Sequence, residues 1–107
     1  MNRESYECTV FESGGEARAH GVGGIWFDWI GDGRNFPADV AAVWIMMPVN
    51  AGDDREVVPA RWTVAMKNPC GAQWQLSGAR DKPTLSPSLH WVDVWHGYLR
   101  NGHCRSC

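Results

Sequence analysis

The dipeptide Asn101-Gly102 is the sequence feature that most constrains the fold of this chain. It lies between two stretches in which apolar and polar residues alternate. Asn-Gly is the preferred centre of a two-residue type I′ turn, in which both central residues need positive φ, so it predicts a β-hairpin. The turn also sets the cross-strand pairs, which are Arg100 with His103, Leu99 with Cys104, Tyr98 with Arg105, and His96 with Cys107.

Several other short stretches combine β-branched and aromatic residues with turn-forming residues at their ends, a pattern typical of strands. The expected strands are 6–11, 25–30, 42–49, 61–67 and 72–76, followed by the hairpin of 89–99 and 103–107. Polar turns are expected at 50–56 and 68–71. We therefore predict a mainly β fold, a small antiparallel sheet or barrel of about six or seven short strands with at most one short helix.

The stretch that follows Pro37 admits two interpretations. Val40, Val43 and Met47 have helical spacing, but residues 42–49 are so uniformly apolar that a buried strand fits equally well. Periodicity does not decide between the two. We favour a short helical turn at 37–41 that leads into a buried strand.

Two segments are expected to lie outside the regular sheet structure. Residues 12–24 contain five glycines and few apolar residues, which predicts a flexible loop. Pro83 and Pro87 bracket an extended segment that we do not expect in a central strand, because neither proline donates a backbone hydrogen bond. The length of 107 residues predicts a single domain over residues 1–107.

The composition limits the classes of function. A net charge of −2 argues against nonspecific nucleic-acid binding, which needs a basic face. The sequence has no apolar run long enough for a transmembrane helix and no signal peptide, so a cytoplasmic location is expected. Most of the seven tryptophans are expected in the core, with one to three exposed in a binding patch. Trp91 and Trp95 share a strand face, opposite His90 and His96, and are the candidate binding residues.

The last part of the chain is rich in zinc-ligand residue types. Three histidines and two cysteines lie within residues 90–107. In the hairpin register, His96 and Cys107 are cross-strand neighbours with Cβ atoms about 5 Å apart, close enough to share one ion. Cys104 lies on the opposite face of an ideal strand and joins them only if the chain leaves strand geometry. With Cys70 from a turn, the candidate zinc site is Cys70, His96, Cys104 and Cys107.

Two alternatives to the zinc site stay open. The cysteines are free in one, and in the other Cys104 forms a disulfide with Cys107 or with Cys70. Cys8 is expected to pack as a small apolar residue.

No catalytic residues are predicted. Ser86 and Ser88 lie beside prolines rather than on a nucleophile elbow. Asp93 and His96 fall on opposite faces of one strand, because they are three residues apart. The residues therefore favour binding over catalysis.

Two stretches of the chain resemble a small, functionally uncharacterised domain family found in phage, prophage and bacterial proteins. The matching residues of the first stretch are Trp74, Gly78, Lys82, Pro83, Thr84, Ser86, Pro87 and Ser88. Those of the second are His96, Tyr98, Leu99, Arg100, Asn101 and Gly102. Trp95 stands where the family has a cysteine. The resemblance covers roughly a third of the chain and implies no particular reaction.

The resemblance, the small size and the tryptophan content together predict a phage-type accessory binding protein with a structural zinc site. Such a protein would bind a host or phage protein in the host cytoplasm, for example to inhibit a host defence. One alternative is a small metal-dependent enzyme or nucleic-acid-processing factor that uses His96. The other is a homo-oligomeric structural component.

Overall fold

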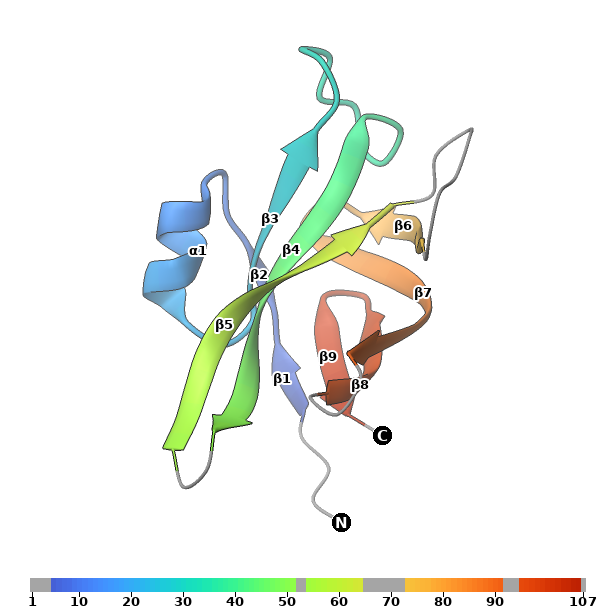
Figure 1. Ribbon diagram of the computed structural model, residues 1–107. Coiled ribbons are helices and arrows are strands. Elements are labelled where there is room, and N and C mark those ends of the chain that lie inside the picture. Colours follow the sequence, from blue (N-terminus) through green and yellow to red (C-terminus); the bar gives the residue numbers. More distant parts are fainter. Residues whose placement is uncertain (1–4, 52–53, 65–72, 92–94, 107) are drawn as a thin grey trace.

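A computed structural model of the protein describes residues 5–51, 54–64, 73–91 and 95–106. Within these residues the strands form two sheets (Figure 1). The five-stranded sheet has the order β1 (Ser5–Glu7), β9 (His103–Ser106), β8 (Trp95–Arg100), β7 (Lys82–Trp91), β6 (Gln75–Ala79). The four-stranded sheet has the order β2 (Thr9–Val10), β3 (Gly24–Trp29), β4 (Val40–Ala51), β5 (Asp54–Thr63). The expected mainly β fold is confirmed, with nine strands in the described residues rather than six or seven.

The core lies between the two sheets. Val43, Ile45 and Met47 alternate along β4 and are fully buried, as expected for the inner face of a strand. Leu89 of β7 and Leu99 of β8 are equally buried and belong to the same apolar cluster. In Figure 1, β4 and β5 cross the molecule diagonally, and β7, β8 and β9 lie to their right.

The segment before β4 behaves as expected. The backbone N–H of Asp39 donates to the carbonyl of Asn35 at 2.8 Å, and that of Val40 donates to Pro37 at 3.2 Å. These bonds form a turn, after which the chain enters the buried strand β4. The hairpin of β4 and β5 extends to the pair Ala51 and Asp54, so the polar turn is shorter than expected.

The hairpin of β8 and β9 confirms the predicted register. Arg100 pairs with His103, and Leu99 pairs with Cys104. Asn101 and Gly102 have φ values of 49° and 71°, the positive values that a type I′ turn requires.

Residues 14–20 correct the expectation of a flexible loop over 12–24. They form α1 (Gly14–His20), whose first turn is capped by the Ser13 hydroxyl accepting from the backbone N–H of Glu16. Ser13 and Glu16 have the spacing of a capping box, which outweighs the low helix propensity of the two glycines after Ser13. No helix in the described residues is long and apolar enough to cross a membrane.

The position of β7 corrects the second expectation, because β7 is an inner strand although it contains Pro83 and Pro87. The carbonyl of Pro83 accepts a hydrogen bond from the backbone N–H of Gly102 in the β8–β9 turn. The nitrogen of Pro83 therefore faces the same side. This position lies beyond the end of β8, so the missing N–H of Pro83 costs no hydrogen bond of the ladder. Pro87 lies where the pairing of β7 with β8 shifts register between Leu85 and Leu89. Prolines are tolerated at such irregular positions.

Candidate functional site

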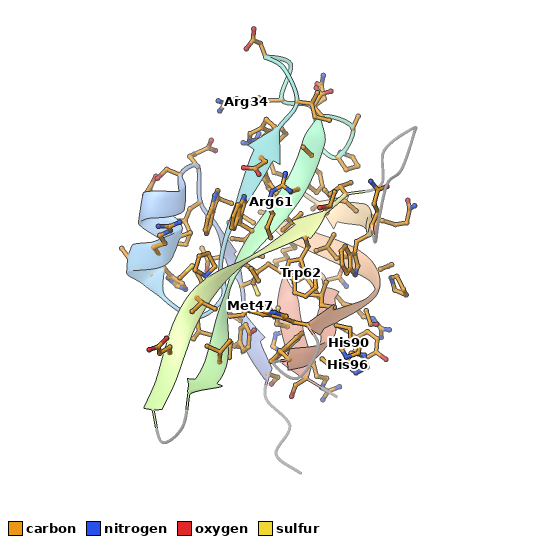
Figure 2. All side chains as sticks on the ribbon, viewed as in Figure 1. Arg34, Met47, Arg61, Trp62, His90 and His96 are labelled. Atoms are coloured by element: carbon orange, nitrogen blue, oxygen red, sulfur yellow. The ribbon has the colours of Figure 1, made fainter. Side chains whose placement is uncertain are left out.

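Two histidines lie side by side where β7 and β8 pair. His90 faces His96 across the two strands, and their ring centroids are 4.7 Å apart. Both side chains are exposed, and they lie together at the lower right of the molecule (Figure 2). The neighbouring residues Leu89 and Gly97 are buried, so the two imidazoles occupy the outer face of the five-stranded sheet.

Ser88 lies next to this histidine pair. It belongs to the irregular stretch of β7 opposite Tyr98, where three residues between Leu85 and Leu89 oppose one residue of β8. Such bulges re-aim side chains and are common near active sites. Ser88 is half-buried and precedes His90 by two residues, the spacing that places side chains on one face of a regular strand. His96 pairs with His90, so it lies across from the residue two positions after Ser88.

A tryptophan holds the backbone at this serine. The indole N–H of Trp74 donates to the carbonyl oxygen of Ser88 at 2.6 Å, and the backbone N–H of Trp74 donates to Thr63 at 2.9 Å. Trp74 therefore connects the end of β5 to the bulge of β7.

The serine and histidine side chains of this site lack the hydrogen bonds of a catalytic triad in the part of the chain that the structure describes. Neither the Ser86 nor the Ser88 hydroxyl makes a hydrogen bond there, and no described carboxylate bonds to His90 or His96. Catalytic hydrogen bonds are often long or absent before substrate binds, so this geometry does not exclude a serine nucleophile with a histidine base.

An aromatic groove borders the same site. Its volume is about 290 Å³, and it runs between the edge of β5 and the last residues of β7. The lining residues are Trp44, Pro59, Ala60, Arg61, Trp62, Trp74, His90 and Trp91. In Figure 2, Trp62 lies below the C-terminal half of β5, and Arg61 lies above it. His90 is thus shared by the histidine pair and the groove.

Of the four predicted zinc ligands, the structure describes His96 and Cys104, and it places them on opposite faces of the β8–β9 hairpin. Cys104 is fully buried on the core side of β9, while His96 is exposed on the opposite face. The chain keeps strand geometry in β9 through Ser106, so the departure from strand geometry that would bring Cys104 to His96 does not occur within β9. Cys70 and Cys107 lie outside the described residues. No described group of three or more His, Cys, Asp or Glu could hold a metal ion. Zinc held by three or four of Cys70, His96, Cys104 and Cys107 stays a prediction for metal analysis.

Cys104 instead contacts another thiol. The Sγ atoms of Cys8 and Cys104 are 3.4 Å apart, and both cysteines are free. The hydrogen bond to Cys104, together with burial, raises the pKa of the Cys8 thiol far above its ordinary value. A thiol in this state is a poor nucleophile and a poor metal ligand.

The two candidate binding tryptophans have different environments. Trp95 is only 8% exposed and belongs to the core, so the expectation that it lies on the surface is wrong. Trp91 pairs with it across the strands, is half-buried and lines the aromatic groove. Its role in binding stays a prediction.

A family model described as bacterial ubiquitination-like system serine protease (BubE) matches residues 47–107, which is more than half of the chain. The chain belongs to the BubE family. No curated protein matches the chain, and no solved structure matches it. The region shared with the BubE family includes β7, β8 and both stretches that carry the resemblance to a bacterial domain family.

The BubE match makes Ser86 and Ser88 candidates for a nucleophile, a role that the sequence did not predict for them. Ser86 and Ser88 were excluded as nucleophiles because they do not lie on a nucleophile elbow. The signal that could have found them is the Pro-Thr-Leu-Ser-Pro-Ser block of residues 83–88, which contains both serines, together with the later stretch that contains His96. His90 lies outside both stretches, and only the pairing of β7 with β8 brings it to the site.

Proposed function

We propose that this chain is a serine-type peptidase that acts on a polypeptide in a bacterial ubiquitination-like system. Ser88 is the nucleophile, and His96 is the general base. The observation that carries the proposal is the exposed pair of His90 and His96, with Ser88 two residues before His90, inside the region that matches the BubE family.

The proposed reaction follows the chemistry of serine peptidases. His96 takes the proton from the Ser88 hydroxyl while the oxygen attacks the carbonyl carbon of the peptide bond. The resulting imidazolium gives the proton to the departing amine, and water then hydrolyses the acyl-serine ester by the reverse proton path. His90 packs against His96 at 4.7 Å and acts as a positioning residue for its ring.

A fluorophosphonate probe tests this assignment without knowledge of the substrate. Purified protein is labelled, digested and analysed by mass spectrometry. We expect the label on Ser88 and its loss in Ser88→Ala and His96→Ala. Ser86→Ala is the matched control, because Ser86 is a half-buried serine of the same irregular stretch, and it should label normally. Equal labelling of Ser88→Ala and the unmodified chain would refute the proposal.

Binding without catalysis is the second candidate function. The unbonded Ser88 hydroxyl and the absence of a described carboxylate at His96 favour it. In this alternative the chain is an accessory protein that binds a host or phage protein, for example a phage-encoded inhibitor of a host defence. A chain that resists the fluorophosphonate but forms a stable complex with a protein of the ubiquitination-like system would support it.

A further inference from the structure

Beyond the contact of Thr63 with Trp74, the outer edge of β5 has no strand partner among the described residues beside the aromatic groove. The backbone N–H of Val64 donates to Ala41 of the strand before β5 in the sheet order. Hydrogen-bonded and non-bonded pairs alternate in an antiparallel ladder, so the N–H and C=O of Thr63 and Arg61 point away from β4. The Thr63 carbonyl accepts from Trp74. The backbone groups of Arg61 have no strand partner among the described residues.

Two further positions continue this edge. Pro59 presents a carbonyl but no N–H, and Val57 presents both groups. Pro59 interrupts the row of donors, which limits uncontrolled pairing of the edge with other chains. The accessible part of the edge nearest to the groove is therefore the single residue Arg61 with the Pro59 carbonyl.

A second edge faces the same groove. β6 pairs with β7 only as far as Ser86, so the later residues of β7 have β8 on one side and no described strand on the other. His90 and Trp91 from this part of β7 line the groove together with Arg61 of β5. A chain entering the groove would thus lie between two strand edges.

Two of the tryptophans that line the groove also carry buried donors without an acceptor among the described residues. The indole Nε1 atoms of Trp62 and Trp44 are buried and make no hydrogen bond in the described part of the chain. Trp62 is only 4% exposed, so water does not reach most of its surface. Buried polar groups are nearly always hydrogen-bonded, so such donors at a cavity point to a ligand that supplies an acceptor.

We propose that this groove binds an extended polypeptide segment that pairs with Arg61 on β5 and inserts an apolar side chain among Trp62, Trp74 and Trp91. A backbone carbonyl of the segment accepts from the Trp62 indole. This inference deepens the proposed peptidase function and rests on it for the nature of the ligand, since the groove and the proposed catalytic site share His90. Strand addition at a sheet edge with side chains in pockets is a common mode of peptide recognition.

The properties of the groove favour a peptide over other ligands. Its volume of about 290 Å³ is at the lower end of the range for ligand sites and suits a side chain rather than a large cofactor. Its one arginine is paired with Asp28 at 3.0 Å, which leaves little positive charge for a nucleic acid. Strand edges offer donors and acceptors at the spacing of a polypeptide backbone.

The test follows the NMR signals of the tryptophan indole N–H groups in the Ser88→Ala variant. This variant cannot cleave the ligand. The probes are acetyl-Ala-Ala-Leu-Ala-Ala-amide and the same peptide with Glu in place of Leu, titrated in ¹H–¹⁵N correlation spectra. Trp62→Phe assigns the relevant signal. We expect the Leu peptide to move the Trp62 N–H signal downfield and to bind at least ten-fold more tightly than the Glu peptide.

Matched variants in the Ser88→Ala background locate the binding. Trp91→Ala should weaken the Leu peptide at least ten-fold, and Trp29→Ala, which removes a half-buried tryptophan outside the groove, should not. An unmoved Trp62 signal at millimolar peptide, or equal binding by the two variants, overturns the inference. If the fluorophosphonate labels Ser88 but the peptide does not shift the Trp62 indole signal, peptide binding in the groove is refuted and the peptidase proposal is not. If the peptide shifts the Trp62 indole signal but the fluorophosphonate does not label Ser88, peptide binding in the groove is supported and the peptidase proposal is refuted.

Discussion

Gly24→Ala tests how closely α1 packs against the four-stranded sheet. A Cβ atom at Gly24 would lie 2.3 Å from the carbonyl oxygen of Ala17 and 2.9 Å from its carbonyl carbon. Both partners are backbone atoms of α1, so no side-chain rotation relieves the overlap. β3 is held between β2 and β4, and the helix must therefore retreat by about 1 Å to restore ordinary contact.

The expected cost follows from the size of this displacement. Ala17 is fully buried, and moving it is an overpacking change of about 1–3 kcal/mol. For a domain of this length, each kcal/mol lowers the thermal midpoint by roughly 4–8 °C. Thermal unfolding followed by circular dichroism measures the shift.

Gly15→Ala is the control on the same helix. A Cβ at Gly15 has only the Ser13 hydroxyl near it, at 4.0 Å. It should raise stability by about 0.4–1 kcal/mol, because alanine loses less conformational entropy on folding. If Gly24→Ala leaves the midpoint unchanged, the close contact between α1 and β3 does not exist.

Three other predictions follow from the structure. Gly102→Val should destabilise the protein by roughly 1–3 kcal/mol, because valine resists the positive φ of the turn after Asn101; an unchanged thermal midpoint would contradict the turn type. Trp95→Ser should cost about 3–5 kcal/mol, because Trp95 is a core residue, and chemical denaturation measures the loss. The raised pKa of Cys8, caused by Cys104 and burial, keeps its proton in the folded state. The free energy of unfolding should therefore be unaffected by this group below about pH 8.5 and fall above it by up to about 1.4 kcal/mol per pH unit, a slope that Cys8→Ala removes.

Local sequence signals predicted the parts of the fold that depend on neighbouring residues. The Asn101-Gly102 turn fixed the hairpin register, because its backbone requirement is met by few other residues. The capping signal of Ser13 and Glu16 was also local, but the surrounding glycines concealed it. The inner position of β7 was not predictable in this way, since the turn at Gly102 supplies the reason that Pro83 is tolerated.

Strand alternation grouped the site residues correctly but did not say which group faces the core. The alternation placed His90 and His96 on one face of a single strand 89–99, and Trp91 and Trp95 on the other. That single strand is wrong, because β7 ends at Trp91 and β8 begins at Trp95, so His90 pairs with His96 and Trp91 with Trp95 across two strands. The histidines, rather than the tryptophans, are the exposed pair. The aromatic groove was beyond sequence reasoning, because it joins Trp62 of β5 to the end of β7 and depends on how the two sheets pack.

The pairing of β1 with β9 has a consequence for the order in which the chain folds. Residues of β3, β4 and β5 form antiparallel neighbours in sequence order, so their sheet needs only short loops to close. β1 has no described partner other than β9, where Ser5 meets Arg105. During synthesis, β1 stays without this partner until the residues up to and including β9 have been added. The backbone N–H and C=O groups of β1 can therefore pair with other nascent chains until β9 has left the ribosome and pairs with β1.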